Sequence, residues 1–363
     1  MFLQKIQLNH FRCYSDLVLD FNQSINLVEG LNGSGKTALL ESIYWQSTGR
    51  SFRHHKPIDL IQHNSVGMSV YSEFLTDEGT TLHKLGVGYQ RNKKKTIKLN
   101  GSVLHKQTDV AHYFPVIAID PDAYLWVDQP PQFRRSFLDW LVFHVKPEYL
   151  SVWKKTIRVQ KQINELLKNQ HHTQLDLWER RYAELAMQTQ IFRNEVFKDL
   201  IPLVVTKIKQ FLPEVKDFTV QLKKGWQTDE IIDQLQKDRQ RNIRLGNLVS
   251  GIHKADIHCY SQERLVNTVL SQGQKKSLAL IFYLSFIDLF QQQTNTKPIV
   301  CIDDIDSELD HYKTELLSQI IQQSGWQVFI SLVDANSLKD QFKSKSVFHV
   351  KQKKGGSTIT PHN

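Results

Sequence analysis

The sequence predicts an α/β fold built around a phosphate-binding loop, with a β-rich layer and a helical lobe inserted into it. Three observations support this fold class. A strand, a glycine-rich loop and a helix follow one another between residues 25 and 46; the chain then becomes strand-like and afterwards helical; and strand and helix patterns alternate again after Ile257. We therefore expect three parts: the first part of the nucleotide-binding lobe at 1–130, the helical insertion at 131–245 and the second part of that lobe at 246–363.

The amino-terminal part is predicted to contain several strands and one helix. Short alternating apolar runs predict strands at Phe2–Leu8, Leu17–Phe21 and Ile25–Glu29, and a helix follows at Ala38–Gln46. From Val66 to Ile119 the strand pattern returns, with a hairpin near residues 91–95 and a turn at Asn100-Gly101.

The rest of the sequence has first a helical pattern and then an alternation of strand and helix patterns. Pro131 to Leu212 has helical periodicity, with apolar residues spaced as in two helices that pack on one another. We interpret Pro213 and the polar stretch 223–229 as breaks between secondary-structure elements. The later elements are expected at Gln274–Gln292 (helix), Ile299–Ile302 (strand), His311–Ser324 (helix) and Gln327–Ser331 (strand), and the polar end, Gln352–Asn363, is expected to be loose.

The composition is that of a folded, basic protein. Its 363 residues include 46 Lys and Arg against 37 Asp and Glu, a formal charge of +9 that favours an anionic partner such as a nucleic acid or a nucleotide. Cys13, Cys259 and Cys301 are far apart, which argues against a disulfide framework or a zinc ribbon. Because the start carries no leader pattern and the longest apolar run, Leu278–Ile287, is about half a membrane span, we expect a cytoplasmic protein with no membrane partner.

The glycine-rich loop fits the complete eight-residue phosphate-binding pattern. It lies between an apolar strand and a helix, where backbone N–H groups converge on phosphate oxygens and the helix directs its positive end at them. Lys36 would contact the β and γ phosphates of ATP, and Thr37 would offer a hydroxyl to Mg²⁺. The loop consists of Gly30, Leu31, Asn32, Gly33, Ser34, Gly35, Lys36 and Thr37.

Two acids end a later strand. Asp303 and Asp304 follow the apolar run Ile299–Ile302. A carboxylate at this place would hold Mg²⁺, so we assign that role to Asp303, and Asp304 would orient or polarise the attacking water. Taken alone, the pattern also fits an ordinary strand end.

A third feature lies before the helix that starts near residue 274. In Leu270-Ser271-Gln272-Gly273-Gln274, Ser271 can cap the helix and Gly273 permits close approach of another backbone. A helix that directs its positive end at an anion outside its own fold makes sense if a second subunit's γ-phosphate docks there, so that ATP lies between two heads. The alternative is a serine-capped helix with no further role.

These residues resemble a known superfamily. The segment Leu270–Gln274 resembles the signature motif of ABC-type ATPases, and Ser307–Asp310 resembles their D-loop. Within that superfamily the chain is similar to the RecF family, which is related to SMC-type heads. The further segments that carry the resemblance are Phe11–Tyr14, Gly49–Arg53, Arg134–Trp140 with Phe143-His144, and His253–Asp256.

The resemblance implies an ABC-type ATPase head that binds ATP and Mg²⁺ and dimerises around the nucleotide. Ser271, Gly273, Gln274 and Asp310 would then contact nucleotide. It also implies a DNA-binding recombination mediator that engages duplex DNA at single-strand gaps and, with RecO and RecR, helps RecA to load. We expect slow, DNA-stimulated hydrolysis.

The chain departs from the family pattern at three places. Gly251-Ile252-His253 stands where a glycine-proline-histidine run is common; Ile117 occupies the position of the glutamine loop; and Leu332-Val333 stands where transporters carry a switch histidine. These departures, with the short Asp304 in place of a glutamate, indicate slow hydrolysis.

Three other classes share part of the pattern. They are the ATPase subunit of a membrane transporter, an ATPase-coupled nuclease of the overcoming-lysogenization type, and a structural head that does not hydrolyse ATP. The helical insertion argues against the transporter, and the nuclease would need a further carboxylate-bearing domain after Asp310.

A basic stretch supplies most of the net charge. Residues 79–108 contain seven Lys and Arg and no acid, so this hairpin could lie along phosphates without reading sequence. Lysines that keep an edge strand from pairing are the alternative. The residues assigned to DNA are Arg91, Lys93, Lys94, Lys95 and Lys98.

Overall fold

The computed structural model describes residues 1–53, 55–76, 80–91, 93, 95–170, 172–304, 311–334, 342, 345–353 and 356–362. Their contacts divide the chain into two units, Met1–Tyr124 with Asn295–Asn363, and Leu125–Thr294. The boundaries thus fall at 124/125 and 294/295, whereas the sequence analysis placed them at 130/131 and 245/246. The reason is that residues 246–294 pack with the helices of the second unit through strand pairing and through a long helix.

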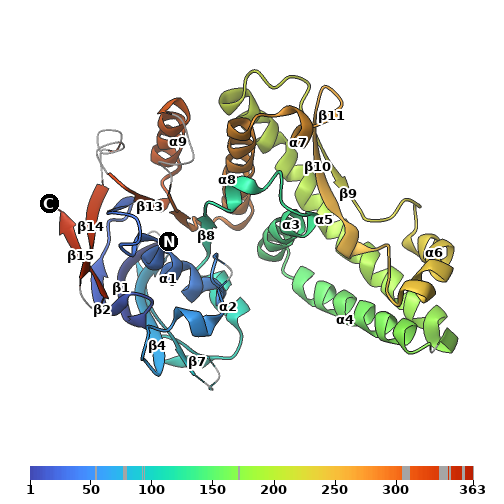
Figure 1. Ribbon diagram of the computed structural model, residues 1–363, viewed down its shortest axis with the longest axis horizontal. Helices are drawn as coiled ribbons and strands as arrows, with labels where there is room; N and C mark the ends of the chain where they lie inside the picture. The colour runs from blue at the N-terminus through green and yellow to red at the C-terminus, as the bar shows by residue number, and fades with distance from the viewer. Residues whose placement is uncertain are drawn as a thin grey trace. The chain divides into compact units, whose positions relative to one another are not determined.

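The first unit contains a six-stranded, mostly parallel sheet that positions the candidate site (Figure 1). The order is β15-β14-β3-β13-β12-β8, and only the edge pair β14–β15 is antiparallel. The carboxyl ends of the parallel strands therefore meet at one edge, where α/β proteins bind ligands. The strands are β3 (Ile25–Glu29), β8 (Val116–Ile119), β12 (Ile299–Ile302), β13 (Gln327–Leu332), β14 (Lys345–Lys353) and β15 (Gly356–His362).

A second, antiparallel sheet in the same unit has the order β2-β1-β4-β5-β6-β7. It confirms the predicted β-rich layer, except that residues 107–113 form a short helix, α2, which was not expected. The elements are β1 (Phe2–Phe11), β2 (Tyr14–Asp20), β4 (Gly67–Thr76), β5 (Thr81–Gln90), β6 (Thr96–Leu99), β7 (Ser102–Leu104) and α2 (Gln107–Tyr113).

Helix α1 (Lys36–Thr48) joins the two sheets. It contacts strands β8, β12 and β13 of the parallel sheet, while the buried Gln46 donates a hydrogen bond to the Leu85 carbonyl of β5 at 2.8 Å. The helix ends at Gly49, whose φ of 70° is favourable only for glycine. Apolar residues of α1 and of both sheets form one core, which includes Leu40, Ile43 and Trp45.

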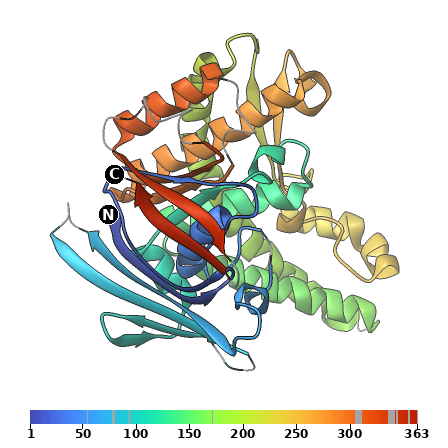
Figure 2. The same cartoon turned by 60° about the vertical axis from the view of Figure 1, so that its left-hand side comes forward.

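The prediction of a loose carboxyl end was wrong. Strand β14 pairs in parallel with β3, and β15 pairs with β14, so the last residues complete the sheet that carries the phosphate-binding loop. Val350 and Ile359 are buried in its core. Figure 2 shows this hairpin as the red strands. The polar composition misled the prediction because every second residue of an edge strand faces solvent.

The second unit is helical, with one small sheet. Helices α4 and α5 pack on one another, as predicted for the helix pair, and α5 also packs on α8. Strand β9 ends at Lys223, where the predicted break begins, and pairs with β10. The elements are α3 (Pro131–Val145), α4 (Tyr149–Lys168), α5 (Leu175–Phe211), β9 (Thr219–Lys223), α6 (Ile231–Leu245), β10 (Asp256–Ser261), β11 (Arg264–Leu265), α7 (Val266–Val269) and α8 (Gln272–Thr294), and the first unit adds α9 (His311–Ser324).

No helix within the described ranges is both long and apolar enough to span a membrane.

Candidate nucleotide-binding site

The phosphate-binding loop runs from the carboxyl end of β3 into α1, as the motif predicts. The Gly30 N–H donates to the Leu332 carbonyl of β13 at 3.3 Å, which ties the start of the loop to the neighbouring strand. The Lys36 ammonium lies over the loop and donates to the carbonyls of Gly30 (2.7 Å) and Leu31 (3.2 Å). The buried Ser34 hydroxyl has no hydrogen-bond partner among the described residues. The loop thus concentrates donors at the start of a helix.

Two of its glycines are required by close approaches. A Cβ at Gly30 would lie 2.5 Å from the Val350 carbonyl oxygen of β14, and Gly30 has a φ of 156°. A Cβ at Gly35, whose φ is 119°, would lie 2.8 Å from the Cys13 sulfur. The Tyr14 hydroxyl also donates to the Gly35 carbonyl at 2.9 Å. The loop is therefore held between the β1–β2 turn and the carboxyl-terminal hairpin.

A hydrogen-bonded group at the strand ends joins the loop to the predicted acid. Asp303 follows β12, and its Oδ1 accepts hydrogen bonds from the hydroxyls of Thr37 (3.0 Å) and Ser331 (2.5 Å). Burial raises the pKa of Asp303 above its usual value, while those two hydroxyls lower it. The structure brings together two residues that lie 266 positions apart in the chain.

Ser331, at the end of β13, was not predicted from the sequence. Its hydroxyl donates to Asp303 and accepts the Asp304 N–H at 2.8 Å. Asp304 has a φ of 56°, a left-handed conformation that is uncommon outside glycine, and the bond from Ser331 helps to hold it there. A serine at the end of an apolar strand carries no sequence signal that would single it out.

Asp120 is a second acid that the sequence analysis did not assign to the site. It follows β8, next to β12, and the Asp303 N–H donates to the Ile119 carbonyl at 2.8 Å. Burial raises the pKa of Asp120 to about 7, and the nearby carboxylates of Asp122 and Asp303 add to the increase. Its Oδ1 accepts the Ala123 N–H at 2.8 Å. Ile117, at the expected glutamine-loop position, is buried within β8.

An ion pair supports α1 from the β1–β2 turn. The Arg12 guanidinium donates two hydrogen bonds to the buried carboxylate of Glu41, from Nε at 2.8 Å and from Nη2 at 3.1 Å. The Ser51 hydroxyl donates to the same carboxylate. Arg12 and Ser51 belong to the segments that carry the family resemblance, and the structure gives them a common partner, Glu41.

These residues line one open pocket of about 1210 Å³ within the first unit. Lys36, Thr37, Asp303 and Asp304 share it, so the structure brings the predicted catalytic and metal residues together. Three basic side chains also line it: Arg12, Arg53 and Arg91.

The donor set of this pocket fits a triphosphate with Mg²⁺. Mg²⁺ takes oxygen ligands, and in nucleotide sites one or two protein groups suffice because phosphates and water supply the rest. The Thr37 hydroxyl and the Asp303 carboxylate, already hydrogen-bonded to each other, are such a pair. In the described residues no group of three or more His, Cys, Asp or Glu could hold a metal by itself.

In the second unit, the predicted signature segment opens helix α8. Ser271 and Gln274 form a reciprocal cap: the Gln274 N–H donates to the Ser271 hydroxyl (3.3 Å), and the Ser271 N–H donates to the Gln274 side-chain carbonyl (2.9 Å). Ser271 and Gly273 are exposed, and a Cβ at Gly273 would meet nothing within 4 Å. The structure confirms that Ser271 caps helix α8. Among the described residues of this chain, no contact requires a glycine at position 273. Asp310 lies outside the described residues.

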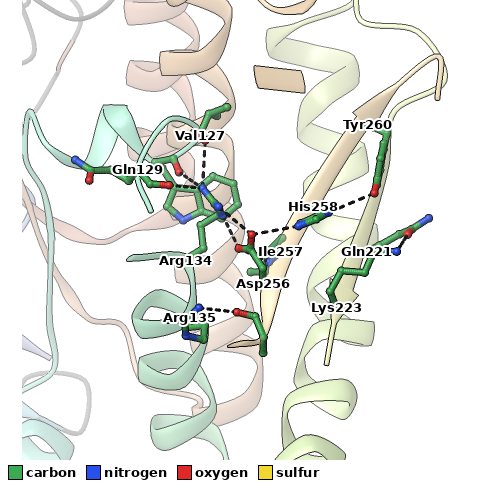
Figure 3. Close-up of polar contacts among 12 residues, drawn as sticks. Val127, Gln129, Arg134, Arg135, Gln221, Lys223, Asp256, Ile257, His258 and Tyr260 are labelled. Carbon is green, nitrogen blue, oxygen red and sulfur yellow. Dashed lines mark hydrogen bonds and ion pairs between the residues drawn. The ribbon is translucent and has the colours of Figure 1, made fainter. Parts of the chain in front are cut away.

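The Arg134–Trp140 and His253–Asp256 segments meet in the second unit (Figure 3). Arg134 on α3 forms a bidentate ion pair with the Asp256 carboxylate at 2.7 and 3.0 Å, and its Nη1 donates to the carbonyls of Trp126, Val127 and Gln129. Arg135 donates to the Ala255 carbonyl at 2.8 Å. Through these bonds, the two arginines connect residues 125–129, at the start of the second unit, to strand β10.

The basic residues of the predicted hairpin differ in their exposure to solvent. Arg91, Lys93 and Lys98 are exposed, whereas Lys95 is half-buried and donates to the Gln107 side chain. Burial, with the nearby charge of Arg50, lowers the pKa of Lys95. Lys95 therefore does not share the exposed surface of the other three, and Lys94 lies outside the described residues.

The fold and the site together define an ABC-type ATPase head of the kind found in SMC proteins. The solved structure described as "Structure of the recombination mediator protein RecF-ATP in RecFOR pathway" matches with a TM-score of 0.87 at 23% identity, over 99% of this chain and 97% of that one. An Smc head domain from Pyrococcus furiosus matches with a TM-score of 0.61 at 16% identity, over 100% of this chain and 96% of that one.

The sequence comparisons show which family within this class the chain belongs to. The family model "RecF/RecN/SMC N terminal domain" matches residues 2–357. The DNA replication and repair protein RecF of Psychromonas ingrahamii is 34% identical, covering 98% of this chain and 99% of that protein, and RecF of Haemophilus influenzae strain 86-028NP is 33% identical, covering 96% and 98%. The chain belongs to the RecF family.

Proposed function

We propose that the chain is an ATP-dependent DNA-binding protein of DNA replication and repair, which binds ATP with Mg²⁺ and dimerises around it. The observation that carries the proposal is the bond between Thr37 of the phosphate-binding loop and Asp303, which follows β12, two strands away from β3 in the sheet. This pair, at the start of a helix and at the carboxyl edge of a parallel sheet, is the arrangement that holds a nucleotide triphosphate and its cation.

Each residue of the pocket has a role in this proposal. The loop N–H groups from Gly30 to Thr37 receive the phosphate oxygens, and the Lys36 ammonium exchanges its loop carbonyls for the β and γ phosphates. Thr37 and Asp303 hold Mg²⁺, which neutralises charge on the phosphates when bound. Asp304 orients the attacking water.

Hydrolysis is expected to be slow. Asp304 has a shorter side chain than a glutamate, and its backbone is held in a left-handed conformation by Ser331. The glutamine-loop position holds the buried Ile117, and Leu332, where a switch histidine is expected, is also buried. Since neither Ile117 nor Leu332 can assist proton transfer, the bound state should persist, as suits a clamp that DNA stimulates rather than a motor.

Dimerisation and DNA binding draw on two exposed features. The capped start of α8, at Ser271 and Gly273, offers N–H groups and a positive helix end to a phosphate held by another copy. Arg91, Lys93 and Lys98 offer charge to DNA phosphates. Since structural relatives are described as recombination mediators in the RecFOR pathway, we extend to this chain an action at gapped duplex DNA, with RecO and RecR, in RecA loading in the cytoplasm.

Sedimentation velocity tests the proposal, with and without ATP and Mg²⁺ and with gapped duplex DNA at two salt concentrations. We expect a monomer that becomes a dimer with ATP, and DNA binding that weakens with salt. A protein that binds ATP but remains a monomer and ignores DNA would contradict the dimer and DNA parts and leave only the nucleotide site.

The nucleotide site itself is tested by Lys36→Ala. Loss of the ammonium removes the charge partner of the triphosphate, so ATP affinity in a calorimetric titration should fall at least about 100-fold, the equivalent of about 2.7 kcal/mol. Lys56→Ala, at an exposed lysine of the same unit, is the matched control and should bind ATP as the wild type does. Unchanged affinity in Lys36→Ala would refute the site.

A further inference from the structure

The second unit contains a polar hollow of about 730 Å³ that is separate from the signature segment. It is lined by residues of α5, α6 and β9 and by two loops, 224–230 and 246–255. We call it the α5–α6 hollow, and define it by Gln190, Lys224, Trp226, Arg241, Ser250 and Lys254.

The charge of this hollow is strongly positive. Four cations line it, Lys223, Lys224, Arg241 and Lys254, against one acid, Asp238. That acid is engaged by neutral donors: its Oδ2 accepts from the Ser250 hydroxyl at 2.6 Å and from the Gln234 amide at 2.9 Å. Arg241 and Lys254 are exposed and form no ion pair with any described residue. The hollow therefore keeps a net charge of about +3, which favours an anion.

The two loops of the hollow are locked together. The Gly251 N–H donates to the Gly225 carbonyl at 3.1 Å, and a Cβ at Gly225, whose φ is 90°, would collide with the Gly251 carbonyl oxygen. The Lys224 ammonium lies 5.4 Å from the centre of the Trp226 ring and donates to the Thr228 carbonyl at 2.6 Å. The cation is thus held in place before any ligand arrives, which lowers the entropy cost of binding.

One buried amide of the hollow is incompletely paired. Gln190 is 4% exposed; its Nε2 donates to Asn194 Oδ1 at 2.8 Å, and its Oε1 has no partner among the described residues. This unpaired oxygen is a hydrogen-bond acceptor, so the preference of the hollow for an anion rests on its cations and not on Gln190.

We propose that the α5–α6 hollow binds phosphate groups. Lysine and arginine with amide and hydroxyl donors recognise phosphate oxygens, and Trp226, 7% exposed and covered by Lys224, offers no open ring face on which a base could stack. Two sources carry this chemistry, the backbone of a nucleic acid and a free polyphosphate such as pyrophosphate. The first source rests on the proposed DNA binding, and the second does not.

Lysine acylation followed by mass spectrometry separates these sources on the unmodified protein. The probes are a 30-base-pair duplex, sodium pyrophosphate and a poly-glutamate peptide of equal charge. We expect the duplex to reduce the acylation of Lys254 at least threefold relative to Lys154 and Lys161, which are exposed on α4 outside the hollow. Protection by pyrophosphate at low millimolar concentration without protection by the duplex would assign a free polyphosphate ligand instead and would also support the site.

A charge-reversal pair tests the same hollow by affinity. Arg241→Glu with Lys254→Glu should lower duplex affinity at least tenfold at 100 mM salt and reduce the slope of log K against log salt by about two, one for each phosphate contact. Lys154→Glu with Lys161→Glu makes the same change in net charge and should leave the slope near the wild-type value.

Three results would overturn the proposal. The first is an equal effect of the two charge-reversal pairs on duplex affinity in a protein whose Lys254 is not protected by pyrophosphate. The second is protection of Lys254 by poly-glutamate but by neither phosphate probe, which would indicate an acidic protein partner. The third is protection by none of the probes. A wild type that binds no duplex while pyrophosphate protects Lys254 would contradict the proposed DNA binding and leave the phosphate site standing.

Discussion

Ser331 shows how one hydroxyl can set the geometry of two carboxylates. It donates to Asp303 and accepts the N–H of Asp304, so it fixes together the acid proposed to hold the cation and the backbone of the acid proposed to orient water. Neither bond involves a neighbour in sequence, since Ser331 lies 28 and 27 residues from its partners. We regard it as a positioning residue.

Ser331→Ala should therefore weaken both stability and cation binding. The Asp304 N–H loses its acceptor and Asp303 loses a donor, at a cost of about 1–3 kcal/mol in the free energy of unfolding measured with urea. The Mg²⁺ concentration needed for half-maximal ATP hydrolysis should rise several-fold. Ser318→Ala, which removes a buried hydroxyl that bonds within α9, is the control and should leave the Mg²⁺ dependence unchanged. An unchanged Mg²⁺ dependence in Ser331→Ala would contradict the positioning role.

Asp120 predicts a pH dependence of stability. Burial raises its pKa to about 7, from 3.8. As pH rises, the unfolded chain loses this proton first, so the folded state loses stability from about pH 4 until the pH has passed about 7. Asp120→Asn keeps an oxygen for the Ala123 N–H and carries no charge, so its stability advantage over the wild type should grow by roughly 2–3 kcal/mol between pH 5 and pH 8.

Urea unfolding of nucleotide-free protein at those two pH values measures this change. Asp16→Asn is the matched control because Asp16 is exposed on β2 and does not act on Asp120, and its difference from the wild type should be the same at both pH values. An Asp120→Asn advantage that does not change with pH would show that this carboxyl group is ionised in the folded protein at pH 5.

At the scale of elements, the carboxyl-terminal hairpin belongs to the nucleotide site. Strand β14 pairs with β3, which leads into the phosphate-binding loop, and the Val350 carbonyl lies against Gly30. The Ser357 N–H of β15 donates to the Cys13 carbonyl at 2.9 Å, beside the turn that contacts Gly35. The hairpin thus braces the loop from both sides.

Ile359→Asp tests this role. Ile359 is buried, and an unpaired carboxylate there should lower the free energy of unfolding by several kcal/mol and weaken ATP binding together with it. Thr360→Asp places the same charge one residue further on, at an exposed position, and should change stability by no more than about 0.5 kcal/mol. If the two variants were equally stable, the end of the chain would be as loose as its composition suggests.

At the scale of the whole molecule, the proposed nucleotide sandwich would take one half of its site from each unit. The first unit holds the phosphate-binding loop, Asp303 and Asp304, and the second holds the capped signature segment. The exposed Ser271, with Gly273 facing open space, predicts that the second half is completed by another copy of the chain.

Ser271→Arg should accordingly abolish the ATP-dependent dimer in sedimentation velocity while the monomer still binds ATP. The arginine adds a bulky cation and removes the helix cap, at a stability cost of about 0.5–2 kcal/mol. Asn267→Arg, on the exposed surface of α7, is the control and should dimerise. A Ser271→Arg protein that dimerises normally would contradict the sandwich.

The sequence by itself determined the class of fold, and it predicted the local motifs of the candidate nucleotide site. Gly30–Thr37 could be assigned because its function depends on a local order of strand, loop and helix, and Asp303 because it ends an apolar strand. The capping role of Ser271 was also local, since the cap joins residues three positions apart. Such features depend on residues that are close together in the sequence, so they can be predicted without knowing which distant segments are in contact.

Tertiary structure alone decided what depends on strands that are far apart in sequence. Parallel pairing of β3, β8, β12 and β13 brings Thr37, Asp120, Asp303 and Ser331 to one edge, and it recruits the polar end of the chain into the sheet. In the same unit, the hydrogen bond from Lys95 to Gln107 of α2 leaves Lys95 half-buried, apart from the exposed residues of the basic hairpin. The physical reason is that burial and hydrogen bonding between distant segments, which raise the pKa of Asp120 and assign Ser331 two partners, arise only when the sheet has formed.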